Sequence, residues 1–441
     1  MPRRLGPGPA GRVRAEGTND MTDAGGNGGK TERKPCAAVI LAAGKSTRMV
    51  TDLPKVLHEV CGRPMLAYVV DACRGAGIDR IVVVVGYRKD DVIAAFAGEP
   101  GLQFVEQTEQ KGTGHAVQIC REALADFEGN VIVIAGDMPL VRTETLTLLR
   151  ETHDREHSAV TLATAILEDP TGYGRIVRDA YGNLQGIVEH ADCTPEQLRI
   201  KEVNPSYYCF DKKLLFEALD SIQPNNVKGE YYLTSVLHIL IRRGYRAVAV
   251  TAVAAEDAMG VNSRQQLAEV GKIMQARIQD RFMTSGVTIV DPPNTWIDAR
   301  ARIGRDTVIH PFTYIHGRVQ IGARCSIGPF AYIRDGTHLA DDVVVGVFAE
   351  LKNAALGEGS RVRHLTYIGD ATIGERVNVG AGTIVANFDG SHVHPTVVDK
   401  DVFIGSGSIL VAPLKLPAGA HVAPGSVITN DSSGNRDGYH R

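Results

Sequence analysis

The 441-residue chain lacks several features that would place it in particular protein classes. It has no apolar run approaching the roughly 20 residues that a membrane-spanning helix needs, so we expect no membrane insertion. Its 48 Lys and Arg side chains nearly balance 51 Asp and Glu, so no strong field favours nucleic acid. Its 7 cysteines are scattered without a C-x-x-C pair, which argues against a disulfide framework and fits a reducing, cytoplasmic compartment.

The first 34 residues also lack a hydrophobic stretch. They are rich in Gly, Arg and Pro, which is not the pattern of a secretory signal. We expect a disordered leader over 1–34. The rest of the chain is ordinary in composition, with 44% hydrophobic and 22% charged residues overall, as in a soluble globular protein.

Short apolar runs alternate with helical patterns from about residue 36 to 255. Strands are expected at 37–41, 81–85, 131–134 and 160–165, helices at 64–75, 113–124 and 143–151, and a hairpin at 174–189 turning at 181–183. The alternation is typical of a Rossmann-like α/β domain with a mostly parallel sheet covered on both faces. Ligands in such folds bind at the carboxyl ends of the strands.

A second period appears further along the chain. Apolar residues at spacings of three and four predict one linker helix over 263–284. Aliphatic residues then recur every six positions, in series from Ile303 to Leu351, Leu356 to Ile368, Ile373 to Val385 and Val398 to Ile428. These 21 repeats predict a left-handed parallel β-helix of seven three-faced coils over 285–430. A loop should leave the coil at 386–397, and a polar tail follows at 431–441.

One motif suggests a phosphate site. The sequence LAAGKSTRM (41–49) follows the first expected strand. A Gly-containing strand-to-helix turn exposes backbone N–H groups that can hold phosphate. Lys45 and Arg48 add positive charge, and Lys55 lies a short loop further on. A polar loop with solvated cations is the competing interpretation of this motif alone.

Two further motifs lie at the ends of expected elements. Asp137, in AGDMP after an apolar strand, could hold Mg²⁺ against a triphosphate. A lone Asp at a strand end is more often a turn or cap residue. Gly112 to His115 precede an expected helix and could simply mark its start.

Together these motifs resemble the sugar-nucleotide pyrophosphorylases. The fuller resemblance is to the bifunctional family of N-acetylglucosamine-1-phosphate uridylyltransferases and glucosamine-1-phosphate N-acetyltransferases. The matching stretches lie in order between 41 and 267: LAAGKSTRM, LPKVLH, EQTEQKGTGHAV, GDMPL, DPTGYGRIV, GIVEH, KGEYYLTSV and GVNSRQQL. The resemblance implies a nucleotidyltransferase domain over 35–262 that joins UTP to N-acetylglucosamine-1-phosphate, with Mg²⁺ as cofactor.

The resemblance also implies roles for residues of this first site. They are Lys55 and Arg48 for phosphate and catalysis; Leu41, Ala42 and Gly44 for substrate; Asp137 and Asn262 for magnesium; Gln107, Gly112 and Thr113 for uracil; and Gly174, Glu189 and Asn204 for the N-acetylated sugar. Ser46 stands where the family usually has glycine. Asn204-Pro205-Ser206 replaces the usual Asn-Thr-Gly.

A second site is implied by residues 348–390, which resemble the family's acetyltransferase core. His364 matches its catalytic base: the amine of glucosamine-1-phosphate must lose a proton as it attacks acetyl-CoA, and a His with pKa near neutrality suits that task. By position alone, His364 would simply be a surface histidine. The other matching residues are Arg334 and Lys352 for the sugar phosphate; Tyr367, Asn378 and Asn387 for the sugar; and Ala381, Ser406 and Pro424 for the acetyl-CoA cleft.

The second half departs further from the family. Phe388 replaces a Tyr, residues 392–396 (HVHPT) replace a lysine-bearing loop segment, the β-helix is shorter before Ile327, and the C-terminal tail has no clear match. The alternative is therefore a uridylyltransferase whose β-helix is only a trimerising scaffold. Glu189 and Asn204 argue against another sugar, and a non-enzymatic binding role would not need the metal and phosphate residues. The resemblance further implies a homotrimer with active sites between subunits, and a role in UDP-N-acetylglucosamine synthesis for peptidoglycan and lipopolysaccharide.

Overall fold

A computed structural model describes residues 34–45, 47–78, 80–224 and 229–429. The expected leader up to residue 33, Ser46 and the expected polar tail lie outside the described residues. No helix within these ranges combines the length and apolar character needed to cross a membrane.

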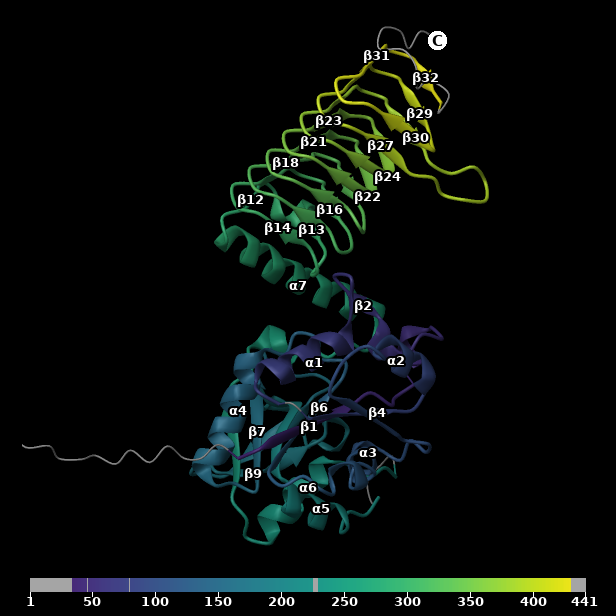
Figure 1. The fold of residues 1–441 in the computed structure, drawn as a ribbon. Helices are drawn as coiled ribbons and strands as arrows, with labels where there is room; N and C mark the ends of the chain where they lie inside the picture. Colours follow the sequence, from purple (N-terminus) through teal and green to yellow (C-terminus); the bar gives the residue numbers. More distant parts are fainter. Residues whose placement is uncertain (1–33, 46, 79, 225–228, 430–441) are drawn as a thin grey trace, which may run out of the picture. The chain divides into compact units, whose positions relative to one another are not determined.

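The first domain is built on one twisted sheet, with strand order β11-β7-β10-β6-β1-β4-β5 (Figure 1). The bounds are β1 Cys36–Leu41, β4 Arg80–Val85, β5 Leu102–Glu106, β6 Asn130–Ala135, β7 Val160–Ile166, β10 Glu202–Asp211 and β11 Ala247–Thr251. Only β10 runs antiparallel to its neighbours along this path. Two hairpins complete the domain: β8 (Gly174–Arg178) with β9 (Leu184–Val188) beside β10, and β2 (Glu59–Val60) with β3 (Arg63–Pro64).

Helices cover both faces of this sheet. On one face, α1 (Met65–Gly75), α2 (Lys89–Ala95) and α4 (Thr143–Glu156) share a core with Ala38 and Ile40 of β1. On the other, α3 (Thr113–Gln118), α5 (Lys212–Leu219) and α6 (Thr234–Arg242) pack with Ala37 and Val39. Successive strand residues point to opposite faces, which is why a nearly continuous apolar strand is buried on both sides. The predicted α/β class is confirmed.

Two expected helices differ in length from the prediction. The helix expected over 113–124 ends at Gln118, and a 3₁₀ turn over Glu122–Leu124 follows it. Cys120 and Leu124 are nonetheless fully buried. Burial at helical spacing therefore did not distinguish one helix from two successive turns. The helix expected over 143–151 continues to Glu156, because Thr152 and His153 are also buried.

The connecting helix, α7 (Arg264–Thr284), begins where the side chain of Ser263 accepts a hydrogen bond from the backbone N–H of Gln266. Two buried glutamines of α7 pair with the first coil of the β-helix. Gln275 both donates to the carbonyl of Ile297 (2.6 Å) and accepts from its N–H (3.0 Å). Gln279 donates to the carbonyl of Thr295 (2.7 Å). The helix thus supplies hydrogen-bond partners to the strand at Trp296–Ile297, which pairs with only one other strand in the described part of the chain.

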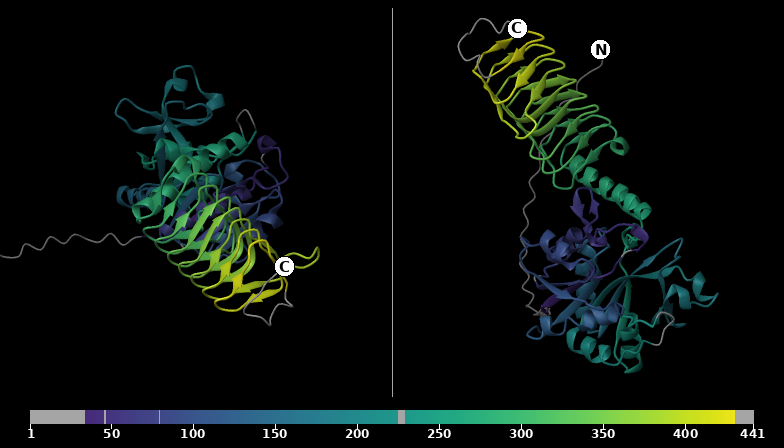
Figure 2. Two further views of the ribbon diagram at one scale, coloured as in Figure 1. Left: turned by 90° about the horizontal axis from the view of Figure 1, so that it is seen from above. Right: turned by 90° about the vertical axis from the view of Figure 1, so that its right-hand side faces the viewer.

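The second domain is a parallel β-helix with three ladders of short strands (Figures 1 and 2). The first ladder contains β12 Thr288–Ile289, β15 Val308–Ile309, β18 Ser326–Ile327, β21 Val344–Val347, β23 Arg361–His364, β25 Asn378–Val379, β28 Phe403–Ile404 and β31 His421–Val422. The second contains β13 Trp296–Ile297, β16 Tyr314–Ile315, β19 Tyr332–Ile333, β22 Glu350–Leu356, β24 Tyr367–Ile373, β26 Ile384–Ala386, β29 Ile409–Val411 and β32 Val427–Ile428. The third contains β14 Arg302–Ile303, β17 Gln320–Ile321 and β20 His338–Leu339, then the last residues of β22 and β24, then β27 Thr396–Val398 and β30 Leu414–Leu416.

The hexapeptide prediction is confirmed by these ladders. The repeated aliphatic residues form the interior of the coil, from Ile309 to Ile428. Two faces, β12 and β13, precede Ile303, where the sequence series began. The expected loop leaves the coil between β26 and β27.

Candidate active sites

The first site lies at the carboxyl ends of β1 and β6, as the α/β fold requires. Leu41 and Ala135, the last residues of these strands, line two adjoining cavities of about 540 Å³ and 310 Å³. The larger cavity is also lined by Arg48, Gly174, Glu189, Asn204 and Asn262. The smaller cavity is also lined by Ala42, Gly44, Lys55, Gln107 and Gly112. Both cavities are lined by Thr113 and Asp137. The structure therefore brings together every first-site residue predicted from the sequence.

The side chains of Asp137 and Asn262 both contact the ammonium group of Lys55. The ammonium of Lys55 pairs with Oδ2 of Asp137 and donates to Oδ1 of Asn262 at 3.0 Å. Among the described residues, no group of three or more His, Cys, Asp or Glu is placed to bind a metal. One carboxylate and one amide oxygen nevertheless fit Mg²⁺, which commonly takes one or two protein ligands and completes its shell with phosphates and water.

Two backbone segments approach closely at Gln107 and Gly112, which the family resemblance assigns to uracil. Gln107 is buried, and its amide donates to the carbonyl of Gly112 at 3.1 Å. Gly112 has φ of 107°, and a side chain there would collide with the backbone of Tyr231. The hydroxyl of Thr113 accepts from the N–H of Leu233 at 3.0 Å. Gly112 is therefore a structural requirement as well as a lining residue.

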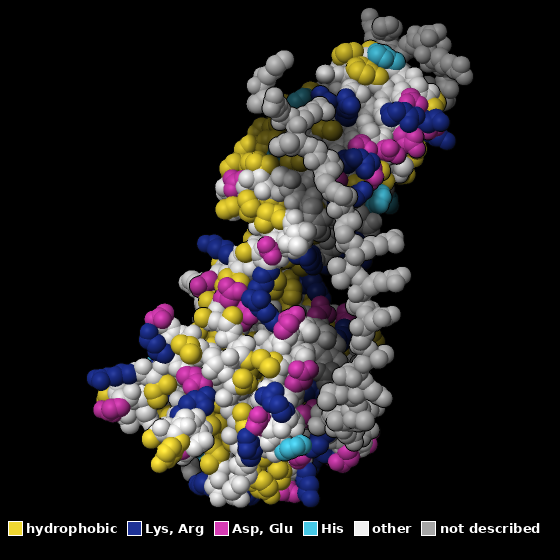
Figure 3. Space-filling model, turned by 90° about the vertical axis from the view of Figure 1, so that its left-hand side faces the viewer, with side chains coloured by type: hydrophobic (Ala, Val, Ile, Leu, Met, Phe, Trp, Pro, Cys, Tyr) yellow, Lys and Arg dark blue, Asp and Glu magenta, His cyan; other side chains and the backbone are white. Residues whose placement is uncertain are grey.

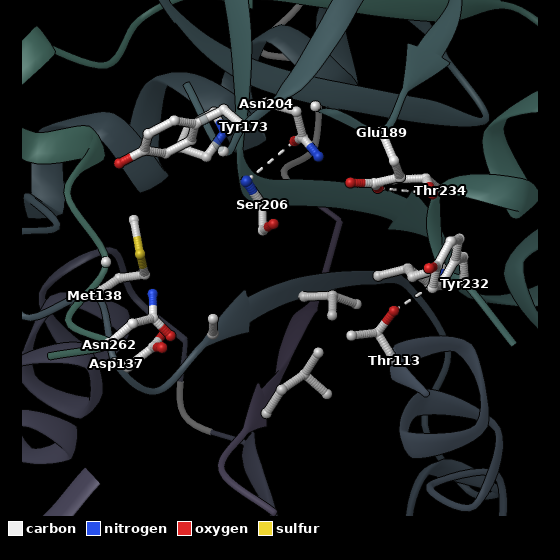
Figure 4. Close-up of a pocket in the computed structure, with 18 of the residues that line it drawn as sticks. Thr113, Asp137, Met138, Tyr173, Glu189, Asn204, Ser206, Tyr232, Thr234 and Asn262 are labelled. Carbon is white, nitrogen blue, oxygen red and sulfur yellow. Dashed lines mark hydrogen bonds between the residues drawn. The ribbon is translucent and has the colours of Figure 1, made fainter. Parts of the chain in front are cut away.

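Glu189 and Asn204, which the family resemblance assigns to the sugar, lie across the cavity from Asp137 and Asn262 (Figure 4). Glu189 accepts a hydrogen bond from the hydroxyl of Thr234 at 3.3 Å. Asn204 is buried; its amide donates to the hydroxyl of Tyr208 at 2.6 Å, and its carbonyl accepts from the N–H of Ser206 at 3.0 Å. These bonds fix both side chains before any ligand arrives.

Some lining residues were not singled out from the sequence. Tyr173, Tyr232 and Thr234 line the larger cavity, and Figure 4 shows them around it. All three lie within the matching stretches DPTGYGRIV and KGEYYLTSV, so the motif could have found them. Lys45 lies instead over the ring of Tyr87, 5.1 Å from its centroid, and does not line either cavity.

Four of the predicted second-site residues lie along one corner of the β-helix. Hydrogen bonds between successive coils join Gly382 N–H to the carbonyl of His364 (3.2 Å), Gly407 to Ala381 (2.7 Å) and Gly425 to Ser406 (2.8 Å). His364, Ala381 and Ser406, with Pro424 beside Gly425, therefore form one column across four coils. Residues separated by 60 positions come into line because each coil repeats the same path.

A second column of stacked residues runs beside the first, and its side chains change from large to absent next to His364. Its members all have positive φ: Phe312, Phe330, Phe348 and Leu365, followed by Gly382, Gly407 and Gly425. The first four are large and exposed, whereas the last three have no side chain. The glycines leave an open strip beside Ala381, Ser406 and Pro424, where a long, flexible ligand could lie against backbone.

Two acidic residues that the sequence analysis missed organise the polar part of this second site. Glu350 accepts from Arg334 at 2.7 Å. Asp370 accepts from Asn387 at 2.5 Å, and its Oδ2 lies 3.7 Å from the ammonium of Lys352. Each carboxylate holds a cationic or amide group that the family resemblance assigns to the sugar phosphate or sugar.

The remaining second-site residues lie on neighbouring strands. Tyr367 pairs in register with Glu350, and its hydroxyl lies over Gly369, leaving no room there for a side chain. Asn378 pairs with Arg361 on β23, the strand that ends at His364. None of the second-site residues lines the two first-site cavities.

Comparison with known proteins identifies the family. Residues 38–219 match the MobA-like NTP transferase domain, and residues 300–335 match six repeats of the bacterial transferase hexapeptide. Proteins named bifunctional protein GlmU are similar over nearly the whole chain. Those of Listeria welshimeri and Clostridium tetani are 41% identical, and that of Geobacillus sp. is 43% identical, each alignment covering 89% of this chain and 93% of the relative.

The chain belongs to the GlmU family. The resemblance seen in the sequence motifs is thereby confirmed, and so is the order of a nucleotidyltransferase domain followed by a hexapeptide β-helix. As a GlmU-family protein, the chain is a bifunctional transferase. Its first site is a cavity within one chain, whereas its second is an exposed corner.

Proposed function

We propose that this chain makes UDP-N-acetylglucosamine in two steps. The β-helix over 285–430 transfers acetyl from acetyl-CoA to glucosamine-1-phosphate. The domain over 35–262, connected by the helix over 263–284, then transfers uridylyl from UTP to N-acetylglucosamine-1-phosphate and releases pyrophosphate. The observation that carries the proposal is that predicted residues scattered between 41 and 262 line two cavities that share Asp137.

The uridylyl transfer needs no covalent enzyme intermediate. The sugar phosphate oxygen attacks the α-phosphorus of UTP in line, and pyrophosphate leaves. Asp137 and Asn262 would hold Mg²⁺, which when bound neutralises charge on the phosphates. Lys55 and Arg48 would hold phosphate groups, while Glu189 with its partner bonds positions the sugar. Holding both reactants in line supplies much of the rate enhancement.

The acetyl transfer would use His364 as base. The amine of glucosamine-1-phosphate attacks the thioester carbon, His364 accepts the amine proton, and the C–S bond breaks to release coenzyme A. Arg334 and Lys352 would bind the sugar phosphate, with Asn378, Tyr367 and Asn387 around the sugar. Ala381, Ser406 and Pro424, beside the column of glycines, would line the acetyl-CoA cleft.

The exposed second site also supports assembly. We propose a cytoplasmic homotrimer in which a neighbouring β-helix covers this corner and completes the site. Hydrophobic side chains gather on the face of the β-helix seen in Figure 3. At the corner itself, Phe312, Phe330, Phe348 and Leu365 are 51%, 45%, 57% and 63% exposed. A stripe of large apolar side chains of this kind is typical of a protein–protein contact.

A scaffold role for the β-helix is the competing proposal, and one observation favours it. Phe388, which lacks the hydroxyl of the family's Tyr, is 62% exposed, and its backbone forms an isolated bridge with Val393. That side chain contributes no polar group to the second site. Retention of the column at His364 supports the bifunctional proposal instead.

Two matched variants test the proposal. His364→Ala should abolish release of coenzyme A thiol from acetyl-CoA and glucosamine-1-phosphate, yet leave UDP-N-acetylglucosamine formation from UTP and N-acetylglucosamine-1-phosphate unchanged. Asp137→Asn should lose at least about 10²-fold in the second assay and keep the first, because a carboxylate ligand is removed from only one site. A wild-type protein with no thiol release would establish the scaffold alternative.

A further inference from the structure

A third, strongly basic cavity lies away from both sites. It has a volume of about 710 Å³ and is formed by the end of α7, the β2–β3 hairpin and the first coils of the β-helix. Five arginines line it, and no acidic side chain does: Arg63, Arg281, Arg300, Arg302 and Arg318. None of its lining residues belongs to the two first-site cavities or to the His364 corner.

Two of these five charges are already neutralised. Arg63 is paired with Asp71 at 2.7 Å. Arg300 is paired with Asp298 at 2.8 Å. Asp298 is nearly fully buried, so Arg300 is held in place at the cavity wall. These two arginines therefore form part of the cavity wall but add little net positive charge to it.

The side chains of the other three arginines form no ion pair among the residues that the structure describes, although Asp335 accepts a hydrogen bond from the backbone N–H of Arg318 at 2.5 Å. Arg302 and Arg318 are exposed and form no ion pair there, and Arg281 lies over the ring of Phe282, 4.9 Å from its centroid. Arg302 on β14 is in register with Gln320 on β17. Side chains on neighbouring rungs stand about 5 Å apart, so Arg302 and Gln320 point the same way, and Arg318 lies two residues before Gln320.

Apolar side chains lie beneath this charge. Phe282 and Val319 are buried, and Ile303 is partly buried, where they line the cavity. Planar guanidinium groups bind phosphate through paired hydrogen bonds, more specifically than lysine does. Volumes of several hundred Å³ are typical of small-molecule sites. Three arginines without a side-chain ion pair, in a hollow of this size, match a ligand with several negative charges.

We propose that this cavity, which we name the arginine groove, binds a small molecule that carries two or more linked phosphates. The phosphate chain would contact Arg281, Arg302 and Arg318. Free polyphosphate and a nucleotide share this chemistry, and the apolar floor offers a surface for the base of a nucleotide. The site is distinct from the nucleotide cavity, so it holds its ligand without competing with uridylyl transfer.

The test compares three full-length proteins by isothermal titration calorimetry with inorganic tripolyphosphate. The groove variant carries Arg302→Ser and Arg318→Ser. The matched control carries Arg305→Ser and Lys415→Ser, which remove two exposed charges from the β-helix outside the groove. Phosphate binding at the first site is common to all three proteins, so a loss confined to the groove variant is assigned to the groove.

Wild type and control should show a class of sites that the groove variant binds at least about tenfold more weakly, equivalent to about 1.4 kcal/mol. The uridylyl transfer rate should be equal in all three. Repeating the titration with ATP separates the sources: tighter binding than tripolyphosphate indicates a nucleotide, and equal binding indicates recognition of the phosphates alone.

Two results would overturn the proposal. The first is identical tripolyphosphate binding by the groove variant and wild type, or an equal loss in the control, because either assigns the effect to the first site or to general charge. The second is a groove variant that loses co-sedimentation with phosphatidylglycerol vesicles yet keeps tripolyphosphate binding. That result would assign the groove to an anionic membrane surface.

Discussion

Ser206 adopts a backbone conformation that L-residues avoid, directly beside the proposed sugar site. Its φ is 70°, and its N–H donates to the side chain of Asn204. The sequence analysis had marked this position because the family usually has glycine there. The structure gives the physical reason: glycine adopts positive φ without the steric cost that a side chain carries.

Ser206→Gly should therefore stabilise the protein. We expect the free energy of unfolding to rise by about 0.5–1 kcal/mol, since relief of left-handed strain is partly offset by the greater entropy of unfolded glycine. Urea denaturation measures it. Ser235→Gly in the first turn of α6 is the control and should not stabilise the protein, because its backbone is helical and glycine relieves no strain there. A loss of stability in both variants would contradict the strain argument.

His153 makes stability depend on pH. Burial lowers the pKa of His153 to about 4, while it hydrogen-bonds Thr161 at 3.0 Å. In the unfolded chain, a histidine takes up a proton near pH 6.5, so between about pH 6.5 and 4 the unfolded state binds more protons than the folded state. The stabilisation is complete above pH 6.5 and is lost as the pH falls, by at most about 3 kcal/mol near pH 4.

His153→Gln should reduce the slope of unfolding free energy against pH between pH 4.5 and 6, whatever its effect on absolute stability. Urea titrations at several pH values measure this slope. The exposed His157→Gln on the same helix end should leave it unchanged. An unaltered slope in His153→Gln would show that other groups set the acid sensitivity.

At the scale of elements, α7 acts as the end cap of the β-helix. Strand β13 pairs with β16 on one side only, and Gln275 satisfies both backbone groups of Ile297 on the other. The periodicity of α7 predicted its existence and its length. It did not reveal that two polar residues would be buried, because a side-chain amide can replace a missing strand only once the partner is in place.

Gln275→Leu should expose the consequence of removing that amide. It leaves a buried N–H and carbonyl without partners, and we expect a loss of about 2–3 kcal/mol in unfolding free energy. Trp296, the only tryptophan in the chain, lies on β13, so its fluorescence reports on this end of the β-helix. The exposed Gln265→Leu on α7 is the control and should change little. An equal loss of unfolding free energy in both variants would show that Gln275 does not cap the β-helix.

The sequence periods predicted some elements correctly and missed others. The hexapeptide series held because one inward aliphatic residue per six positions is a geometric requirement of each face of the coil. It missed β12 and β13, whose spacing is irregular where the chain leaves α7. The helical period in the first domain, for its part, did not predict that α3 ends at Gln118, because burial alone does not specify the local turn.

For the molecule as a whole, the exposed phenylalanines argue for a subunit contact at the second site. Phe312, Phe330 and Phe348 are stacked, with ring centroids 4.8 Å and 5.1 Å apart, and Leu365 continues the column next to His364. If a partner β-helix covers them, assembly and acetyl transfer depend on the same surface.

Phe330→Glu combined with Phe348→Glu should dissociate the proposed trimer, because two charges cannot be buried in an apolar contact without partners. Light scattering should then give the mass of one chain, with acetyl transfer lost and uridylyl transfer retained. Phe403→Glu, an exposed aromatic of β28 stacked on His421, is the matched control and should keep the assembly. Dissociation with acetyl transfer intact would place the whole second site within one chain.

The sequence by itself determined the two folds and marked residues that line the two first-site cavities. Strand, helix and hexapeptide periods are local properties, and the family motifs mark the segments that carry side chains such as Asp137, Gln107 and Glu189. Tertiary structure alone decided which distant groups meet. It placed Lys55 on Asp137 and Asn262, Asp370 between Lys352 and Asn387, Gln275 on an open strand edge and arginines from α7 and two coils around one groove. These contacts join residues far apart in the chain, and a local sequence period cannot predict which of them will come into contact.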